Sequence, residues 1–186
     1  MSYTLTFETN NGTSIDPVTF DENTEVDLNE YVTRRQGYDF VSWCNDSDLT
    51  EEITSVTMTG DKTIYAKWQV NNQIKEMRLI ILGDANNAEK DNLFEYYLKV
   101  AFNTYVIKVY PFKFDEIVEL PKMALDWQTR CAIQLYDNYV NGLDNAIMYS
   151  ENGLQIQFAK GGLSKDLLAE LPPTHASVPL EDEKSK

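Results

Sequence analysis

The stretch that decides the fold is Lys62-Thr-Ile-Tyr-Ala-Lys-Trp68-Gln-Val-Asn-Asn72. Its first seven residues are rich in β-branched and aromatic side chains, which is typical of a strand. From Asn72 onward, four apolar residues recur with helical spacing: Ile74, Met77, Ile80 and Ile81. Gly83 follows, where a left-handed cap would end the helix. The pattern changes just after Trp68, which predicts two unrelated modules in one chain.

Composition agrees with two small globular domains of roughly 70 and 100 residues. The chain has 186 residues, of which 42% are hydrophobic, and its net charge is −14. Residues 1–70 hold 13 acidic and 4 basic residues, so they carry −9, which leaves −5 for the rest. Such a charge disfavours binding along a nucleic-acid backbone. It remains compatible with DNA that slides past without specific binding.

Two cysteines and the N-terminal residues bear on the compartment. Cys44 and Cys131 fall in different modules, so we expect two reduced, packed thiols rather than a disulfide. No basic segment followed by an apolar one opens the chain, and no apolar run approaches the roughly 18 residues of a membrane span. We therefore expect a protein made in a cytoplasm, without a signal peptide and without a membrane partner.

The first module alternates in the manner of strands. Tyr3, Leu5 and Phe7 are spaced by two, and Asn10-Asn11-Gly12 then predicts a turn because Asn and Gly tolerate positive φ. A short helical turn is expected at 28–32. In the stretch 37–43, strict alternation places Tyr38 and Phe40 on the face opposite Val41 and Trp43.

These motifs, in this order, resemble the Listeria-Bacteroides repeat, the B-repeat of internalin-type surface proteins. The resemblance rests on Tyr-Thr-Leu-Thr-Phe at 3–7, Asn-Gly at 11–12, Gly-Tyr-Asp-Phe-Val-Ser-Trp at 37–43 and the closing strand 64–68. Asn11 stands where the family usually has a second glycine. The resemblance implies a small β-grasp fold that acts as a spacer or interaction module and supplies no catalytic residues.

Two features of this module admit a functional alternative. Four carboxylates, Asp46, Asp48, Glu51 and Glu52, could form a calcium loop, but the glycine and glutamate of the EF-hand spacing are missing. A solvated acidic loop is the preferred interpretation. Trp43 and Trp68 could form a platform for a sugar ring, yet in so small a domain we expect them in the core.

The second module is predicted to be mainly helical. Asn86-Asn87-Ala88-Glu89 has the form of a capping box, which would start a helix over 88–109. That helix carries a wide apolar stripe: Leu93, Phe94, Tyr97, Leu98, Ala101, Phe102, Tyr105, Val106 and Val109. Pro121 is expected as the first residue of the next helix, which ends near Asn141. One side of it is apolar: Ala124, Cys131, Ala132, Leu135, Tyr136 and Tyr139, with Trp127 near its start.

A hairpin and a short helix complete the module. The alternation of Leu154, Ile156 and Phe158 with two glutamines, after an Asn-Gly pair, predicts a β-hairpin over 146–158. Ser164 is placed to cap a last helix that runs through Leu171. Two prolines at 172–173 would end it.

This order of elements resembles the head-tail connector, or adaptor, proteins of tailed bacteriophages. The resemblance covers residues 72–173, and its best marker is the Ser150-Glu151-Asn152-Gly153 turn. It implies a homo-oligomeric ring, twelvefold, at the neck of the virion. The partners would be the portal protein, a tail, stopper or tail-completion protein, and passing DNA, in a protein made in the host bacterial cytoplasm.

The sequence thus predicts a two-domain protein: a small β-grasp-like α+β domain over 1–70, a mainly α-helical connector domain with a β-hairpin over 71–173, and a tail over 174–186 that is flexible or ordered by a partner. The expected contacts between subunits or rings are Ile147, Tyr149, Asn152, Gly153, Gln155, Gln157, Val178 and Leu180. No enzyme motif, cofactor or metal site is expected, and His175, the single histidine, lies in the tail. The alternative is a bacterial surface or adhesion protein whose repeat binds a receptor or glycan.

Overall fold

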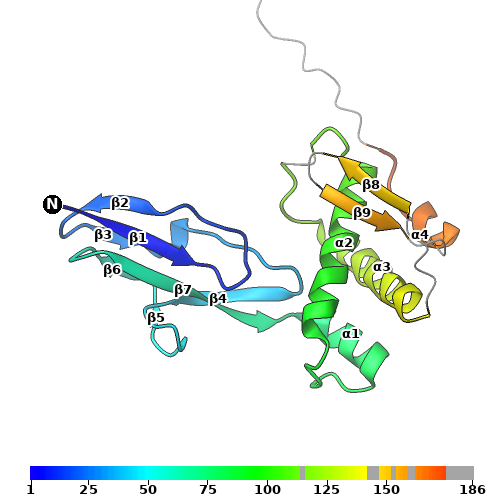
Figure 1. Ribbon diagram of the computed structural model, residues 1–186, viewed down its shortest axis with the longest axis horizontal. Helices are drawn as coiled ribbons and strands as arrows, with labels where there is room; N and C mark the ends of the chain where they lie inside the picture. Colours follow the sequence, from blue (N-terminus) through cyan, green and yellow to red (C-terminus); the bar gives the residue numbers. More distant parts are fainter. Residues whose placement is uncertain (114–115, 142–146, 152–153, 159–161, 175–186) are drawn as a thin grey trace, which may run out of the picture. The chain divides into compact units, whose positions relative to one another are not determined.

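The computed structural model describes residues 1–113, 116–141, 147–151, 154–158 and 162–174. It divides into two compact units, Met1–Lys75 and Glu76–Lys186, called here the strand unit and the helical unit. A mixed sheet forms the first, and helices with one hairpin form the second, so the protein is a two-part α+β protein (Figure 1). The division falls inside the first α-helix, a few residues beyond the predicted boundary at 70.

The strand unit is built on a five-stranded mixed sheet. Its strands are β1 (Ser2–Glu8), β2 (Val18–Asp21), β4 (Tyr38–Cys44), β5 (Glu52–Ile53) and β7 (Lys62–Val70). Their order is β2-β1-β7-β4-β5, with the parallel pair β1 and β7 inside the sheet. The short strands β3 (Glu25–Asp27) and β6 (Ser55–Thr57) pair separately, and the 3₁₀ turn Leu28–Glu30 lies where a helical turn was predicted.

The aromatic residues of this unit lie in and around its core. Trp43 is 2% exposed and stacks edge-on against Phe7, and its indole N–H donates to the Tyr31 carbonyl oxygen over 3.1 Å. Trp68 packs against the same core while partly exposed, and its indole N–H donates to the Thr9 carbonyl oxygen over 2.9 Å. The core interpretation is confirmed for Trp43 and holds in part for Trp68.

The turn after β1 follows the prediction with one refinement. Asn10 and Asn11 adopt φ of +48° and +69°, so the asparagines supply the left-handed conformation. Gly12 is required for a different reason. A Cβ at Gly12 would lie 2.5 Å from Oγ1 of Thr33 and 2.6 Å from Cζ2 of Trp68, so only glycine fits without a shift of its neighbours.

Strand β4 corrects one prediction. Its register with β7 shifts between Phe40 and Ser42, which leaves Val41 as an extra residue. Such a bulge breaks the alternation of faces. Phe40 therefore contacts both Trp43 and Trp68, each with 5.5 Å between ring centroids, and the prediction that Phe40 and Trp43 lie on opposite faces was wrong.

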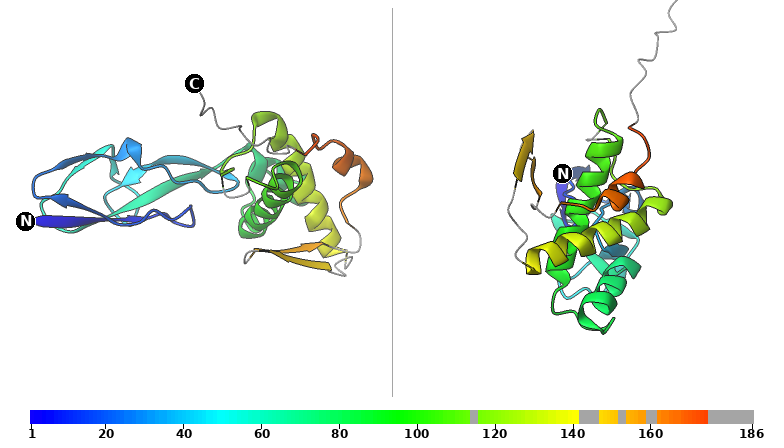
Figure 2. Two further views of the ribbon diagram at one scale, coloured as in Figure 1. Left: turned by 90° about the horizontal axis from the view of Figure 1, so that it is seen from above. Right: turned by 90° about the vertical axis from the view of Figure 1, so that its right-hand side faces the viewer.

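The helical unit centres on two long helices, α2 (Asp91–Val109) and α3 (Lys122–Val140), preceded by α1 (Asn72–Leu82) (Figures 1 and 2). Phe94 packs against Tyr136 and Tyr105 against Trp127, so the start of one helix lies beside the end of the other. The predicted stripe on α2 is confirmed. Its side chains are buried or half-buried: Leu93, Phe94, Tyr97, Leu98, Ala101, Phe102, Tyr105, Val106 and Val109.

Several helix ends differ from the prediction. The Asn87 side chain accepts from the Glu89 N–H, an interaction within a turn, so the capping box does not form and α2 begins at Asp91. Pro121 is the residue before α3 rather than its first residue. Ser164 does cap α4 (Lys165–Ala169), accepting from the Leu167 N–H, but that helix ends before Leu171.

The apolar stripe of α1 was assigned too widely. Ile74 and Met77 are fully buried, whereas Ile80 is more than half exposed. A charged residue takes the inner position, because Arg78 pairs with Asp91 and also donates to the Ala85 carbonyl oxygen over 3.0 Å. On α3, Tyr139 is likewise exposed, although the pattern placed it on the inner side.

Among the described residues, no helix has the length and apolar character that crossing a membrane requires.

Cys44 and Cys131 are both free and buried, as predicted. Burial raises the pKa of the Cys131 thiol to about 12.

Candidate assembly interface

The predicted hairpin forms from β8 (Ile147–Glu151) and β9 (Leu154–Phe158). The strands are antiparallel, and the register pairs Ile147 with Phe158 and Tyr149 with Ile156. Asn152 and Gly153 of the turn, and Val178 and Leu180 of the tail, lie outside the described residues. The hairpin prediction is confirmed for the two strands.

The register separates the predicted contact residues into two sets. Because successive residues of a strand belong to alternate faces, Ile147 and Tyr149 share one face with Leu154, Ile156 and Phe158. Gln155 and Gln157 belong to the other face. One flat contact therefore cannot use all four of the predicted residues in these strands.

The short helix α4 is fastened to α3 by two independent contacts. Trp127 is 4% exposed, and its indole N–H donates to the Leu167 carbonyl oxygen over 2.7 Å. On the surface, the Arg130 guanidinium donates hydrogen bonds to both carboxylate oxygens of Glu170, over 2.9 and 2.5 Å. The same guanidinium also donates to the Asp126 carboxylate. The hydrogen bond from Arg130 lowers the pKa of the Glu170 carboxyl, and the same bond raises the pKa of Arg130.

Polar contacts also fix α2 against α3. The Gln128 side chain, 1% exposed, donates to the Leu98 carbonyl oxygen over 2.9 Å. Lys90 donates to the Tyr136 hydroxyl over 2.7 Å, and this bond raises the pKa of the Lys90 ammonium. A buried polar group without a partner costs about 1–3 kcal/mol, so these contacts favour one packing of the helices over alternatives. The helix pair is thus a defined scaffold.

The helical unit leaves many large apolar side chains exposed. Nine of its described residues belong to this set: Leu79, Ile80, Tyr96, Phe112, Val118, Met123, Tyr139, Val140 and Leu168. Single exposed hydrophobic residues are ordinary, but groups of them mark contact surfaces. The sequence prediction missed this set, because helical periodicity alone assigned Ile80 and Tyr139 to the core.

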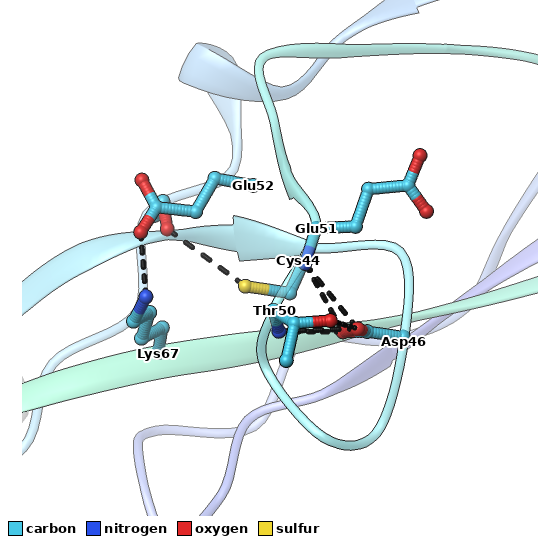
Figure 3. A network of polar contacts seen from close by, with 7 residues as sticks. Cys44, Asp46, Thr50, Glu51, Glu52 and Lys67 are labelled. Atoms are coloured by element: carbon cyan, nitrogen blue, oxygen red, sulfur yellow. Dashed lines mark hydrogen bonds and ion pairs between the residues drawn. The ribbon is translucent and has the colours of Figure 1, made fainter.

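In the strand unit, the acidic loop after β4 is organised by its own chain (Figure 3). The Asp46 carboxylate accepts from the Thr50 hydroxyl and from the N–H groups of Thr50 and Glu51. The Thr50 hydroxyl bond is the main cause of the lowered pKa of Asp46. Glu52 pairs with Lys67 at 2.6 Å, which lowers the pKa of this glutamate. The Glu51 carboxylate accepts from the Asn45 side-chain amide over 2.9 Å, so three of the four carboxylates have structural partners.

Comparisons with known proteins concern the strand unit. Residues 3–67 match the family model of the Listeria-Bacteroides repeat domain, which confirms the resemblance predicted from the motifs of this unit. Two proteins of Evansella cellulosilytica are similar over 71 residues, or 37% of this chain: a "Putative Gly-rich membrane protein", 32% identical, and a "Putative membrane protein", 30% identical. The matched part spans 8% and 10% of these relatives, so the chain corresponds to a small part of each.

Proposed function

We propose that this protein is a structural component of the virion of a tailed bacteriophage. In this proposal, the helical unit is a head-tail connector, or adaptor, that forms a ring at the neck and joins the portal to the tail or stopper. The strand unit, a β-grasp-like repeat domain, would project from that ring as a decoration. The protein acts by assembly and carries out no reaction.

The observation that carries the proposal is the order of elements in the helical unit. A long helix is followed by a helix that begins after a proline, a two-stranded antiparallel hairpin, and a serine-capped short helix. This is the order that the connector resemblance implies. The contacts of Trp127 and Arg130 with α4 support it, since they hold the last element against α3.

A ring also requires suitable surfaces. Closed rotational symmetry repeats one heterologous interface, in which two different surfaces of the same subunit meet. The exposed apolar residues of the helical unit could form part of such surfaces. We expect the hairpin to contact neighbouring subunits or the next ring. Residues 71–186, which include the helical unit, carry a net charge of −5, and this sign suits a channel that DNA crosses without binding.

The mass of the purified full-length chain tests this proposal. Light scattering coupled to size-exclusion chromatography should give a discrete multiple of 21.4 kDa, twelvefold by our expectation, at high concentration or on addition of the portal protein from the same phage. Electron microscopy of that species should reveal a closed ring. A chain that stays monomeric at every concentration and does not bind the portal protein would count against the connector function.

A second candidate is a bacterial surface or adhesion protein that binds a receptor or glycan through the repeat domain. The names of the two similar Evansella proteins favour it, since both are described as membrane proteins. A glycan array probed with the full chain discriminates the two. Selective binding by a monomer supports the surface protein, whereas a ring without glycan binding supports the connector.

A further inference from the structure

The segment over residues 162–174, called here the strap, is fastened along one stripe of α3. It contains α4 and the residues on either side of it. Four side chains of α3 form hydrogen bonds with the strap: Trp127, Arg130, Gln134 and Asn138. Because these residues are three or four positions apart, they belong to the same side of the helix.

Three of these four contacts involve backbone groups of the strap rather than its side chains. They join Trp127 to the Leu167 carbonyl oxygen over 2.7 Å, Gln134 to the Ser164 N–H over 3.1 Å, and Asn138 to the Gly162 carbonyl oxygen over 3.5 Å. The fourth contact, from Arg130 to the Glu170 carboxylate, has both partners exposed to water. At the far end of the strap, the Thr174 hydroxyl donates to the Lys108 carbonyl oxygen of α2 over 3.1 Å.

The strap itself adds little to the core of the helical unit. Leu167 is its one buried side chain, at 5% exposure, whereas the next residue, Leu168, is 36% exposed. The five residues of α4 are too few for a helix that is stable by itself. Hydrogen bonds and ion pairs that water can reach contribute little net stability. One leucine and a row of polar contacts therefore hold the strap in place.

The helix pair has contacts of its own that do not involve the strap. The Trp127 ring packs against Tyr105 of α2, with 5.4 Å between ring centroids. Gln128, the next residue of α3, donates to the Leu98 carbonyl oxygen of α2. Removal of the strap would take away the partner of the Trp127 indole N–H and would leave both of these contacts in place.

We propose that the strap is a latch, which opens as one unit while α2 and α3 stay folded. Its opening uncovers the α3 stripe and frees the Trp127 indole N–H for another acceptor. Local openings cost less free energy than global unfolding, and segments that exchange contacts during binding are drawn from the least stable parts of a fold. The latch does not depend on the connector proposal, because all of its contacts lie within the helical unit.

Hydrogen exchange of the full-length chain, followed by NMR, tests the latch. Two protons report on the strap: the Trp127 indole N–H and the backbone N–H at position 168, which donates to the Ser164 carbonyl oxygen. Their protection factors should be similar, and at least about tenfold lower than that of the backbone N–H of Ala132 in the core of α3. Mild urea should accelerate exchange at Ala132 strongly and at the strap only weakly, because a local opening exposes little surface.

Two alanine variants provide a matched comparison within α4. Leu167→Ala removes the buried side chain of the strap and should lower the protection of both strap protons about tenfold. Leu168→Ala makes the same change at the neighbouring exposed position, so it should leave both protons near their parent values. Ala132 should keep its protection in both variants, which also verifies that the helix pair remains folded.

Three results would overturn the latch. If the strap protons and Ala132 exchange at the same protection with the same urea dependence in the parent, the strap opens only when the unit unfolds. If Leu167→Ala lowers the protection of Ala132 as much as that of the strap protons, the strap is an integral part of the core. If the N–H at position 168 exchanges rapidly while the Trp127 indole N–H stays protected, the strap does not open as one unit.

Discussion

The strand unit and the helical unit reach stable cores by different means. In the strand unit, the central pair joins β1 to β7 across more than fifty residues of sequence, and aromatic side chains fill the space between distant segments. In the helical unit, each helix forms from local hydrogen bonds, and the helix pair leaves much apolar surface exposed. The first unit therefore has the character of a self-contained module, whereas the second retains the exposed apolar surface on which our assembly proposal rests.

Of the substitutions that should destabilise one unit and not the other, Phe94→Ala is expected to have the largest effect on stability. Phe94 is fully buried on α2 and packs against Tyr136, so its removal should destabilise the helical unit by about 3–5 kcal/mol. The two buried cysteines report on the units separately, since Cys131 belongs to one and Cys44 to the other. Thiol labelling at pH 8 under mild denaturant should then reach Cys131 well before Cys44. Equal acceleration at both would mean that the units unfold together.

Gly12→Ala tests the strand unit in the same way. The added Cβ would overlap Thr33 and Trp68, and overpacking of this kind costs about 1–3 kcal/mol. Labelling of Cys44 should accelerate, with Cys131 unaffected. Gly60→Ala is the matched control, because a Cβ there meets nothing within 4 Å, and its effect should stay within about 0.5 kcal/mol. Equal effects at both glycines would refute the steric explanation.

A smaller effect is expected at the junction between the units. The side-chain oxygen of Asn71 accepts from the backbone N–H groups of Gln73 and Ile74 at the start of α1. The backbone N–H of Asn71 donates to the Gly37 carbonyl oxygen. Asn71→Ala removes the cap and should cost about 1 kcal/mol in urea unfolding. Asn71→Asp retains an acceptor and should restore most of it. An alanine variant as stable as the parent would show that the cap is dispensable.

The smallest expected effect is a loss of stability at acidic pH, where the contact that holds α4 against α3 weakens. Arg130 lowers the pKa of Glu170 from its ordinary value of 4.5, so the contact stabilises the folded protein above that pH and is lost as the pH falls through the lowered value. The contact is exposed, and the effect should be modest. The indole N–H resonance of Trp127, which reports on Leu167, should shift in this range. Glu170→Gln should abolish that shift; an unchanged titration would place its cause elsewhere.

Periodicity predicted most of both units, because burial on one face imposes a spacing of two in strands and of 3.6 in helices. It recovered the α2 stripe and the two strands of the hairpin. The capping preference of serine, rather than periodicity, predicted the cap at Ser164. Periodicity failed at Phe40, where a bulge inserts one residue, and at Ile80, where Arg78 occupies the inner position. Neither failure has a local signal, since each depends on a partner strand or on Asp91 in another helix.

The sequence by itself determined the existence of two modules, the type of nearly every element, and the repeat family of the first module, since these follow from local patterns and short motifs. Only the tertiary structure decided which apolar residues stay exposed, how Arg78 is neutralised inside the helical unit, and where the bulge in β4 falls. The physical reason is that exposure, ion pairing and register depend on the residues that folding brings together from distant positions. The candidate surfaces for assembly belong to this second kind of information.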